Sequence, residues 1–182
     1  MGIARAGAND APPADLDTPT ESSAESWRGI TIAPESRCSA YDQNDYSYSA
    51  ASIENRIVEA MDGRIFGPYS MTTFPDIKQT HISRLIAPSE AHDSGLCAAD
   101  SATRRAFARD LDNLTLAAPI TRNRKQAYDA AEWLPDNNRC WFANRVVEVR
   151  RKYDLTIDHA EAAALEAVLA GCTSTEMTFG DQ

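Results

Sequence analysis

The sequence predicts an α+β fold in a single, mainly helical domain. Several segments carry apolar residues at helical spacing, and short runs of strand-forming residues lie between them. The 182 residues are enough for one domain with a core of its own. Hydrophobic residues make up 43% of the chain and charged residues 25%, which is the composition of an ordinary soluble globular protein.

The chain is expected to begin with a disordered lead. Residues 1–28 are rich in Ala, Pro, Asp, Ser and Thr, and Trp27 is their one aromatic residue. Such a composition cannot bury enough apolar surface to offset the entropy of ordering. The folded domain is therefore expected over residues 29–178, with a short tail over 179–182. Its first part, residues 36–49, is polar and Tyr-rich, and predicts a loop.

The next elements follow from apolar spacing and from helix and strand stops. Ile53 and Ile57 share one face of a helix expected over residues 50–63, and Gly63 is a suitable stop. Short strands are expected where strand-forming residues run up to a proline, over residues 64–70, 81–87 and 114–119.

The later helices are marked by their caps and apolar faces. They are expected over residues 101–114, 138–155 and 158–171, with a single helical turn over residues 128–135. Asp100 or Ser101 caps the first of these helices. Asp158 begins the last one, and Glu161 stands three residues later at the spacing of a capping box. Gly171 closes that helix.

Charge and hydropathy narrow the expected partners. The formal net charge of −9 differs from the basic footprint of most nucleic-acid binders, so nucleic acid is less expected than a small molecule. No apolar run approaches the roughly 18 residues that span a membrane. The N-terminus lacks the continuous apolar segment of a signal peptide. A cytoplasmic protein is therefore expected, or an exported one if a signal was removed.

The chain contains four cysteines, at positions Cys38, Cys97, Cys140 and Cys172. No two of them have the CxxC spacing of a zinc knuckle. An exported protein would form two disulfides, whereas a cytosolic one would keep four thiols. The sequence leaves all three pairings open.

Long stretches of the chain resemble one family. "RCSAYDQNDY", "SEAHDSGLCAA", "RRAFARDLDNLTLAAP" and "DAAEWLPDNNRCWFANRVVEVRRKY" resemble HNH endonuclease-like proteins, which are related to the C-terminal nuclease domain of modification-dependent restriction enzymes. The resemblance covers about residues 30–178, and the cysteine positions match as well. It implies a ββα-metal core, in which two short strands and a helix hold one divalent metal, often Mg²⁺, against the scissile phosphate.

The segment "THISRLIAPSEAH" departs from the family's first motif, Asp-Ile-Glu-His. His81 stands in place of the metal-binding Asp, Ser83 in place of the Glu, and Arg84 in place of the His that takes a proton from water. An arginine, with a pKa above about 12, cannot accept that proton at neutral pH. Its charge would also repel a metal ion. The resemblance therefore implies a degenerate ββα core without the nuclease mechanism.

Later positions follow the family in part. Thr121 stands where an Asn is expected, whereas Lys125 is kept. Asn113 is kept too, and it fits the residue that positions the active-site loop.

The remaining polar residues predict a different chemistry. The candidate catalytic residues are His81, Arg84, Glu90 and His92: a histidine as base, Glu90 as its orienter or as acid, and Arg84 as an anion clamp. Candidate substrate-binding residues are Ser83, Asp93, Lys125 and Tyr128. This set predicts an enzyme without metal or cofactor that acts on an anionic small molecule. Cyclisation, isomerisation, elimination or hydrolysis would suit it, as in specialised metabolism.

Two alternatives remain open at this point. A divergent HNH endonuclease would bind one divalent metal and cleave DNA. A catalytically inactive binding protein would lack a well-formed pocket and expose an apolar patch. Glu90 and His92 also fit a structural role, and Arg84 could pair with Glu90 in an inactive site. The oligomeric state is left open.

Overall fold

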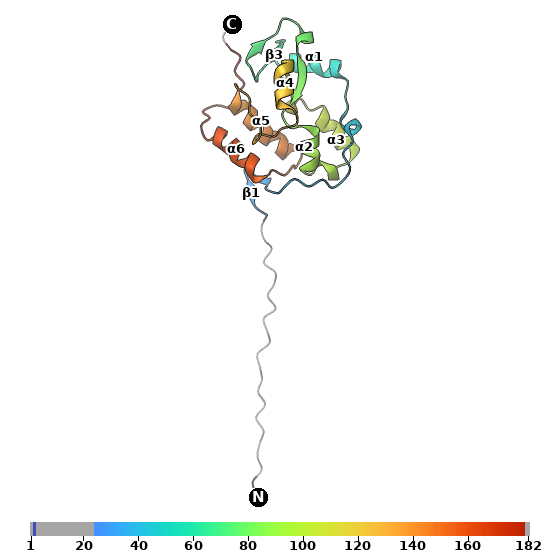
Figure 1. The fold of residues 1–182 in the computed structure, drawn as a ribbon, viewed down its shortest axis with the longest axis vertical. Coiled ribbons are helices and arrows are strands. Elements are labelled where there is room, and N and C mark those ends of the chain that lie inside the picture. Colours follow the sequence, from blue (N-terminus) through green and yellow to red (C-terminus); the bar gives the residue numbers. More distant parts are fainter. Residues whose placement is uncertain (1, 3–23, 181–182) are drawn as a thin grey trace.

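The computed structural model describes residue 2 and residues 24–180. Within this part, the chain forms six α-helices and three two-stranded antiparallel sheets, which confirms the α+β class (Figure 1). Most of the expected N-terminal lead lies outside the described residues. Its end differs from the expectation, because Ser26–Trp27 forms a strand. None of the described helices has the length and apolar content needed to cross a membrane.

The elements follow one another as short helices and strands. The helices are α1 (Ala50–Ala60), α2 (Pro88–Asp93), α3 (Ser101–Ala108), α4 (Pro119–Lys125), α5 (Arg139–Lys152) and α6 (His159–Leu169). The antiparallel strand pairs are β1 (Ser26–Trp27) with β2 (Ile30–Thr31), β3 (Phe66–Gly67) with β4 (Thr72–Thr73), and β5 (His81–Arg84) with β6 (Leu114–Ala117). Four 3₁₀ turns lie between them: η1 (Gln43–Tyr46), η2 (Ile77–Gln79), η3 (Leu96–Ala98) and η4 (Leu111–Asn113).

The four long helices expected from the sequence are present with shorter bounds. The helix expected over 101–114 ends at Ala108, because the Asp110 side chain caps the separate turn η4. The expected helical turn over 128–135 is a hydrogen-bonded turn, in which the Asp129 carboxylate accepts from two backbone N–H groups. Helices α2 and α4 were not expected.

The core has two parts. The larger part lies between the neighbouring helices α5 and α6 and the helices α2 and α3, with Phe107, Phe142 and Leu165 at its centre. The smaller part joins α1 to β3 and β6 through Ile57 and Phe66. Phe179 belongs to the expected short tail, but its ring packs on Phe66 with ring centroids 4.9 Å apart.

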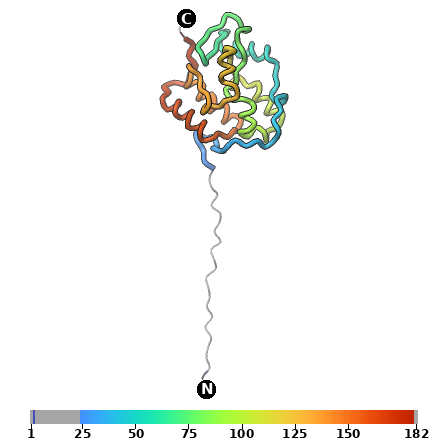
Figure 2. Tube along the Cα trace, in the orientation of Figure 1, coloured from blue at the N-terminus to red at the C-terminus, as the bar shows by residue number. Residues whose placement is uncertain are grey.

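The segment between β2 and α1 wraps round one side of the molecule (Figure 2). It contains little regular structure, and its polar contacts hold it in place. Ile32 forms a parallel bridge to Ile157, and the Ser36 N–H donates to the carbonyl of Asp93.

All four cysteines form disulfides. Cys38 is bonded to Cys97 and Cys140 to Cys172, which selects one of the three pairings that the sequence left open. The expectation of a cytoplasmic protein is not supported, because disulfides form and persist in oxidising compartments and are rare in the cytosol.

Candidate functional site

A cleft of about 910 Å³ lies where three parts of the chain meet. One side is the segment 41–48. The others are the stretch from β5 to the start of α2, and α4 with the residues after it. Its lining includes Arg84 and Arg122 together with tyrosine, serine and amide side chains. No Asp or Glu is among the described residues that line it, although the chain carries 27 of them.

Strand pairing places β5 against the cleft. β5 and β6 pair antiparallel, with Ser83 opposite Thr115 and Arg84 opposite Leu114. β6 leads directly into α4, which packs against β5. The pair and the helix together therefore hold Ser83 and Arg84 at the cleft.

Within residues 24–180, Arg84 has no ion-pair partner. Its guanidinium carbon lies 5.1 Å from the centroid of the Tyr48 ring, within the range of a cation–π contact. Its Nε is buried and has no hydrogen-bond partner in the described structure. The alternative in which Arg84 pairs with Glu90 is not observed, because Glu90 binds Arg150 instead.

Two tyrosines beside Arg84 are held in the neutral form. Burial raises the pKa of Tyr41 and of Tyr48, and the positive charge of Arg84 opposes this rise only in part. Both phenols therefore keep their protons at neutral pH and can donate hydrogen bonds to a ligand.

The expected histidine and glutamate of an acid–base pair are not brought together in the cleft. His81 is exposed and lies outside the lining. Glu90 points into the interior, where it accepts from Arg150 at 2.8 Å and from the Ser94 hydroxyl at 3.0 Å. Neither side chain lines the cleft.

His92 has a structural position behind the cleft wall. Its ring is fully buried. Nε2 lies 2.9 Å from the carbonyl oxygen of Ser39 and must donate, because a carbonyl only accepts. In the neutral ring, Nδ1 then accepts from the Tyr46 hydroxyl at 2.9 Å. Burial raises the pKa of Tyr46 to about 12, so this donor stays protonated.

Of the expected substrate-binding residues, only Ser83 lies in the cleft. Asp93 forms an ion pair with Arg37, with atoms 2.6 Å apart. Lys125 is buried and donates to the Tyr128 carbonyl at 2.9 Å, and burial lowers its pKa to about 8. The Tyr128 side chain is exposed outside the lining.

Asn113 is hydrogen-bonded to the turn between β5 and α2. It is fully buried next to β6. Its Oδ1 accepts from the Ile86 N–H at 2.8 Å, and its Nδ2 donates to the Ile86 carbonyl at 2.9 Å. These two bonds fix the turn from β5 into α2, which carries Ala87, Pro88 and Ser89 into the cleft lining.

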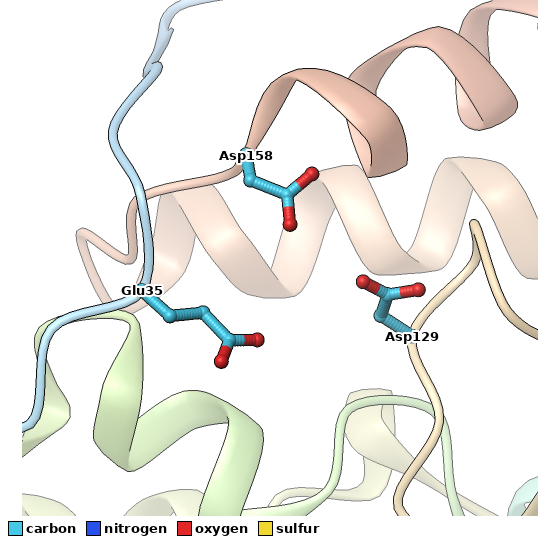
Figure 3. Close-up of side chains that lie close together, drawn as sticks. All are labelled: Glu35, Asp129 and Asp158. Carbon is cyan, nitrogen blue, oxygen red and sulfur yellow. The ribbon is translucent and has the colours of Figure 1, made fainter.

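A separate group of carboxylates could hold a metal ion. The group consists of Glu35 in the segment between β2 and α1, Asp129 in the loop before α5, and Asp158 at the start of α6. Their carboxylates point toward one another (Figure 3). One carboxylate oxygen from each lies within 4.8 Å of the others. Hard cations such as Ca²⁺ prefer such oxygens. A hydrogen bond with Glu90, together with burial, raises the pKa of Glu35 to about 7.

Arg150 is the centre of a buried ion-pair network beside these carboxylates. Its guanidinium donates to Glu90 and to Glu161, and it is fully buried. Burial raises the pKa of Glu161 to about 7, and the charge of Arg150 opposes the rise. The sequence did not single out this network, because its members are far apart along the chain.

Several cleft residues were also missed from the sequence. They are the polar side chains of α4 and of the segment 41–48, among them Arg122, Asn123, Gln126, Gln43 and Asn44. The basic run of α4 was visible in the sequence, but nothing local showed that it faces β5.

The comparisons with known proteins give one informative similarity. The chain is 30% identical over 118 residues to an uncharacterized secreted protein of Arthroderma benhamiae. The match covers 62% of this chain and 57% of that protein, so this chain spans less than two thirds of the relative's length. No family model matches the chain, and no solved structure matches it.

Proposed function

We propose that this protein is exported and that its cleft binds a small molecule through an oxyanion group, a phosphate or a carboxylate. The observation that carries the proposal is Arg84. It lies in a cleft lined without carboxylates, its Nε is buried without a partner, and its ring-stacked guanidinium has no ion pair in the described structure.

An unpaired guanidinium calls for an anionic ligand. A buried donor left without an acceptor costs about 1–3 kcal/mol, and more when charged. The planar fork of an arginine matches phosphate and carboxylate, which it binds through two parallel hydrogen bonds. The Tyr48 ring, 5.1 Å from the guanidinium carbon, contacts Arg84 without accepting its N–H groups as an anion would.

The charge of the lining points to the same ligand class. The chain carries a net charge of −9, yet the described lining contains Arg84 and Arg122 and no acidic residue. A cleft lined by one sign of charge concentrates ligands of the other sign. The neutral phenols of Tyr41 and Tyr48 add donors beside the arginines.

The proposal includes descent from the ββα scaffold. An antiparallel strand pair is followed directly by a helix that packs on the first strand, which supports this descent. In the resemblance, Arg84 takes the place of the family's proton-accepting His. His81, Glu90 and His92 lie outside the cleft. The proposal is therefore limited to recognition of the anion and assigns no acid–base step.

Two further observations support export. All four cysteines are paired in two disulfides, which is typical of proteins in oxidising compartments. The relative in Arthroderma benhamiae is described as secreted, and the match to it spans more than half of this chain.

The test is a calorimetric titration with inorganic phosphate, a sugar phosphate and glucuronate at low salt. Arg84→Gln should weaken binding by roughly 10- to 100-fold, because a hydrogen bond to a charged group contributes about 1.5–3 kcal/mol. Arg124→Gln is the matched control. This substitution also removes one positive charge, but Arg124 is on α4 outside the cleft lining, so binding should change little. Equal affinities of the two variants would contradict the proposal, and the three ligands distinguish phosphate from carboxylate.

A further inference from the structure

We infer that the Cys38–Cys97 disulfide is a redox-sensitive latch on the cleft, so that its reduction lowers the affinity for the anion. This inference rests on the proposed function, since it concerns the same cleft. It follows from which part of the chain forms the cleft wall, and from how that part is attached to the rest of the molecule.

One wall of the cleft is a single stretch of chain. Tyr41, Gln43, Asn44, Tyr46, Ser47 and Tyr48 all line it. The one regular element in this stretch is the 3₁₀ turn η1, and the chain before it has no helix or strand back to β2. The wall therefore has no sheet or long helix of its own to hold it and depends on its attachments.

The attachments converge on η3. The disulfide joins Cys38, three residues before the wall, to Cys97 in η3. Arg104 binds Asp45 of η1 at 2.7 Å, and it also donates to the Cys97 carbonyl at 2.7 Å. The Ser39 hydroxyl donates to the same carbonyl at 3.1 Å. The disulfide is the covalent member of this set, and the others are polar contacts. Tyr46 also holds the wall, because it is buried against Phe107 and its hydroxyl binds His92.

The wall in turn holds Arg84. Tyr48, at the end of the wall, carries the guanidinium of Arg84 on its ring. If the wall loosens, Arg84 loses this stacking contact, and the cleft loses the side that carries Tyr41. Anion affinity should fall for both reasons, although the strand pair that carries Arg84 stays in place.

The Cys38–Cys97 disulfide is accessible to a reductant. Cys38 is exposed, whereas Cys97 is buried. A thiolate of a dithiol attacks the sulfur of Cys38, the more exposed residue of the pair, and the Cys97 sulfur leaves as a thiolate and takes a proton. The second thiol of the reductant then closes a cyclic disulfide and releases Cys38 as a thiol. Two electrons pass from the dithiol, which is oxidised, to the protein disulfide, which is reduced.

The second disulfide provides the internal control. Cys140 is the second residue of α5 and Cys172 follows α6, and both residues are half-buried. Neither residue lines the cleft or lies in the wall segment. Opening this bond should leave the anion affinity unchanged.

The experiment uses graded reduction of the full-length protein with dithiothreitol. Alkylation and mass spectrometry measure the fraction of each disulfide that is open, and calorimetry measures the binding of inorganic phosphate. The affinity should fall at least about 10-fold as Cys38–Cys97 opens, while circular dichroism shows an intact fold. Unchanged affinity with this bond open, or a loss that follows only Cys140–Cys172 or global unfolding, would overturn the latch.

A matched pair of double variants makes the same comparison without a reductant. C38S/C97S should bind phosphate at least about 10-fold more weakly than C140S/C172S. A folded C38S/C97S protein with the affinity of the parent would count against the latch.

Failure of the proposed function can be told apart from failure of the latch. If the oxidised protein binds none of the three anions, the proposed function is wrong. Amide hydrogen exchange of residues 41–48 then still tests the latch, because these amides should exchange faster once Cys38–Cys97 opens. Exchange that does not change would overturn it.

Discussion

Replacing Asn113 by Ala tests how the turn into the cleft is held. The Asn113 amide satisfies both backbone polar groups of Ile86, which is 2% exposed. Alanine removes both bonds and leaves an N–H and a carbonyl buried in the space that the amide occupied. Water has little access to this position, since Asn113 and its neighbour Leu114 are buried as well.

The expected loss follows from these two groups. Each buried polar group left without a partner costs about 1–3 kcal/mol, so the free energy of unfolding should fall by about 2–6 kcal/mol. Urea denaturation with both disulfides intact measures this difference. Asn144→Ala is the control, because Asn144 binds only the exposed Glu148 at 2.9 Å and its loss should cost less than about 0.5 kcal/mol.

A loss below about 1 kcal/mol for Asn113→Ala would refute the reasoning, because it would mean that the groups of Ile86 find other partners. Asn113→Asp adds a sharper check with nearly the same shape. Its second oxygen would face the Ile86 carbonyl, so the carboxyl should be protonated in the fold and its pKa raised. That variant should therefore be more stable at acid pH and lose stability as the pH rises through the folded-state pKa.

The pH dependence and the packing of β3 give two further expectations. Burial raises the pKa of Glu161 from 4.5 to about 7, so the folded protein binds this proton more tightly than the unfolded chain does. The resulting contribution to the free energy of unfolding is present at acid pH and is lost as the pH rises through 7. The free energy of unfolding should fall between about pH 5 and 7.5, and Glu161→Gln should flatten that part of the curve; an unchanged slope would exclude Glu161 as its source. A Cβ at Gly67 would lie 3.0 Å from the Phe74 ring, so Gly67→Ala should lower the melting temperature at a cost of about 1–3 kcal/mol. At Gly171 the nearest atom would be 3.7 Å away, so Gly171→Ala should change stability by less than about 0.5 kcal/mol, and equal losses in the two variants would contradict the packing argument.

Local signals in the sequence predicted local structure well. Asp100 caps α3 by accepting from the Thr103 N–H at 2.7 Å, and Asp158 caps α6 at 2.8 Å, because both caps depend on residues within one turn. In the sequence, Pro88 and Pro119 predict only the ends of strands. A proline also suits the first turn of a helix, and the same two residues begin α2 and α4.

The cleft could not be predicted from local patterns, because it depends on strand pairing and on the direction of helix faces. Ser83 and Arg84 lie in it because β5 pairs with β6 in a fixed register. Glu90 and His92 are close to them in sequence, but they follow the turn into α2, which directs both into the interior while Ser89 stays at the cleft. Neighbouring positions on a helix face different directions, so closeness along the chain did not imply a shared site.

The hydrogen-bond chain through His92 makes its imidazole a natural spectroscopic reporter. The chain has three histidines, of which His81 and His159 are exposed. The buried Nε2–H of His92 is held by the Ser39 carbonyl, so its proton should exchange slowly with water and remain visible by nuclear magnetic resonance. Tyr46 binds the other side of the ring. A single resonance, assignable by its protection alone, would therefore follow the state of the whole cleft wall in solution.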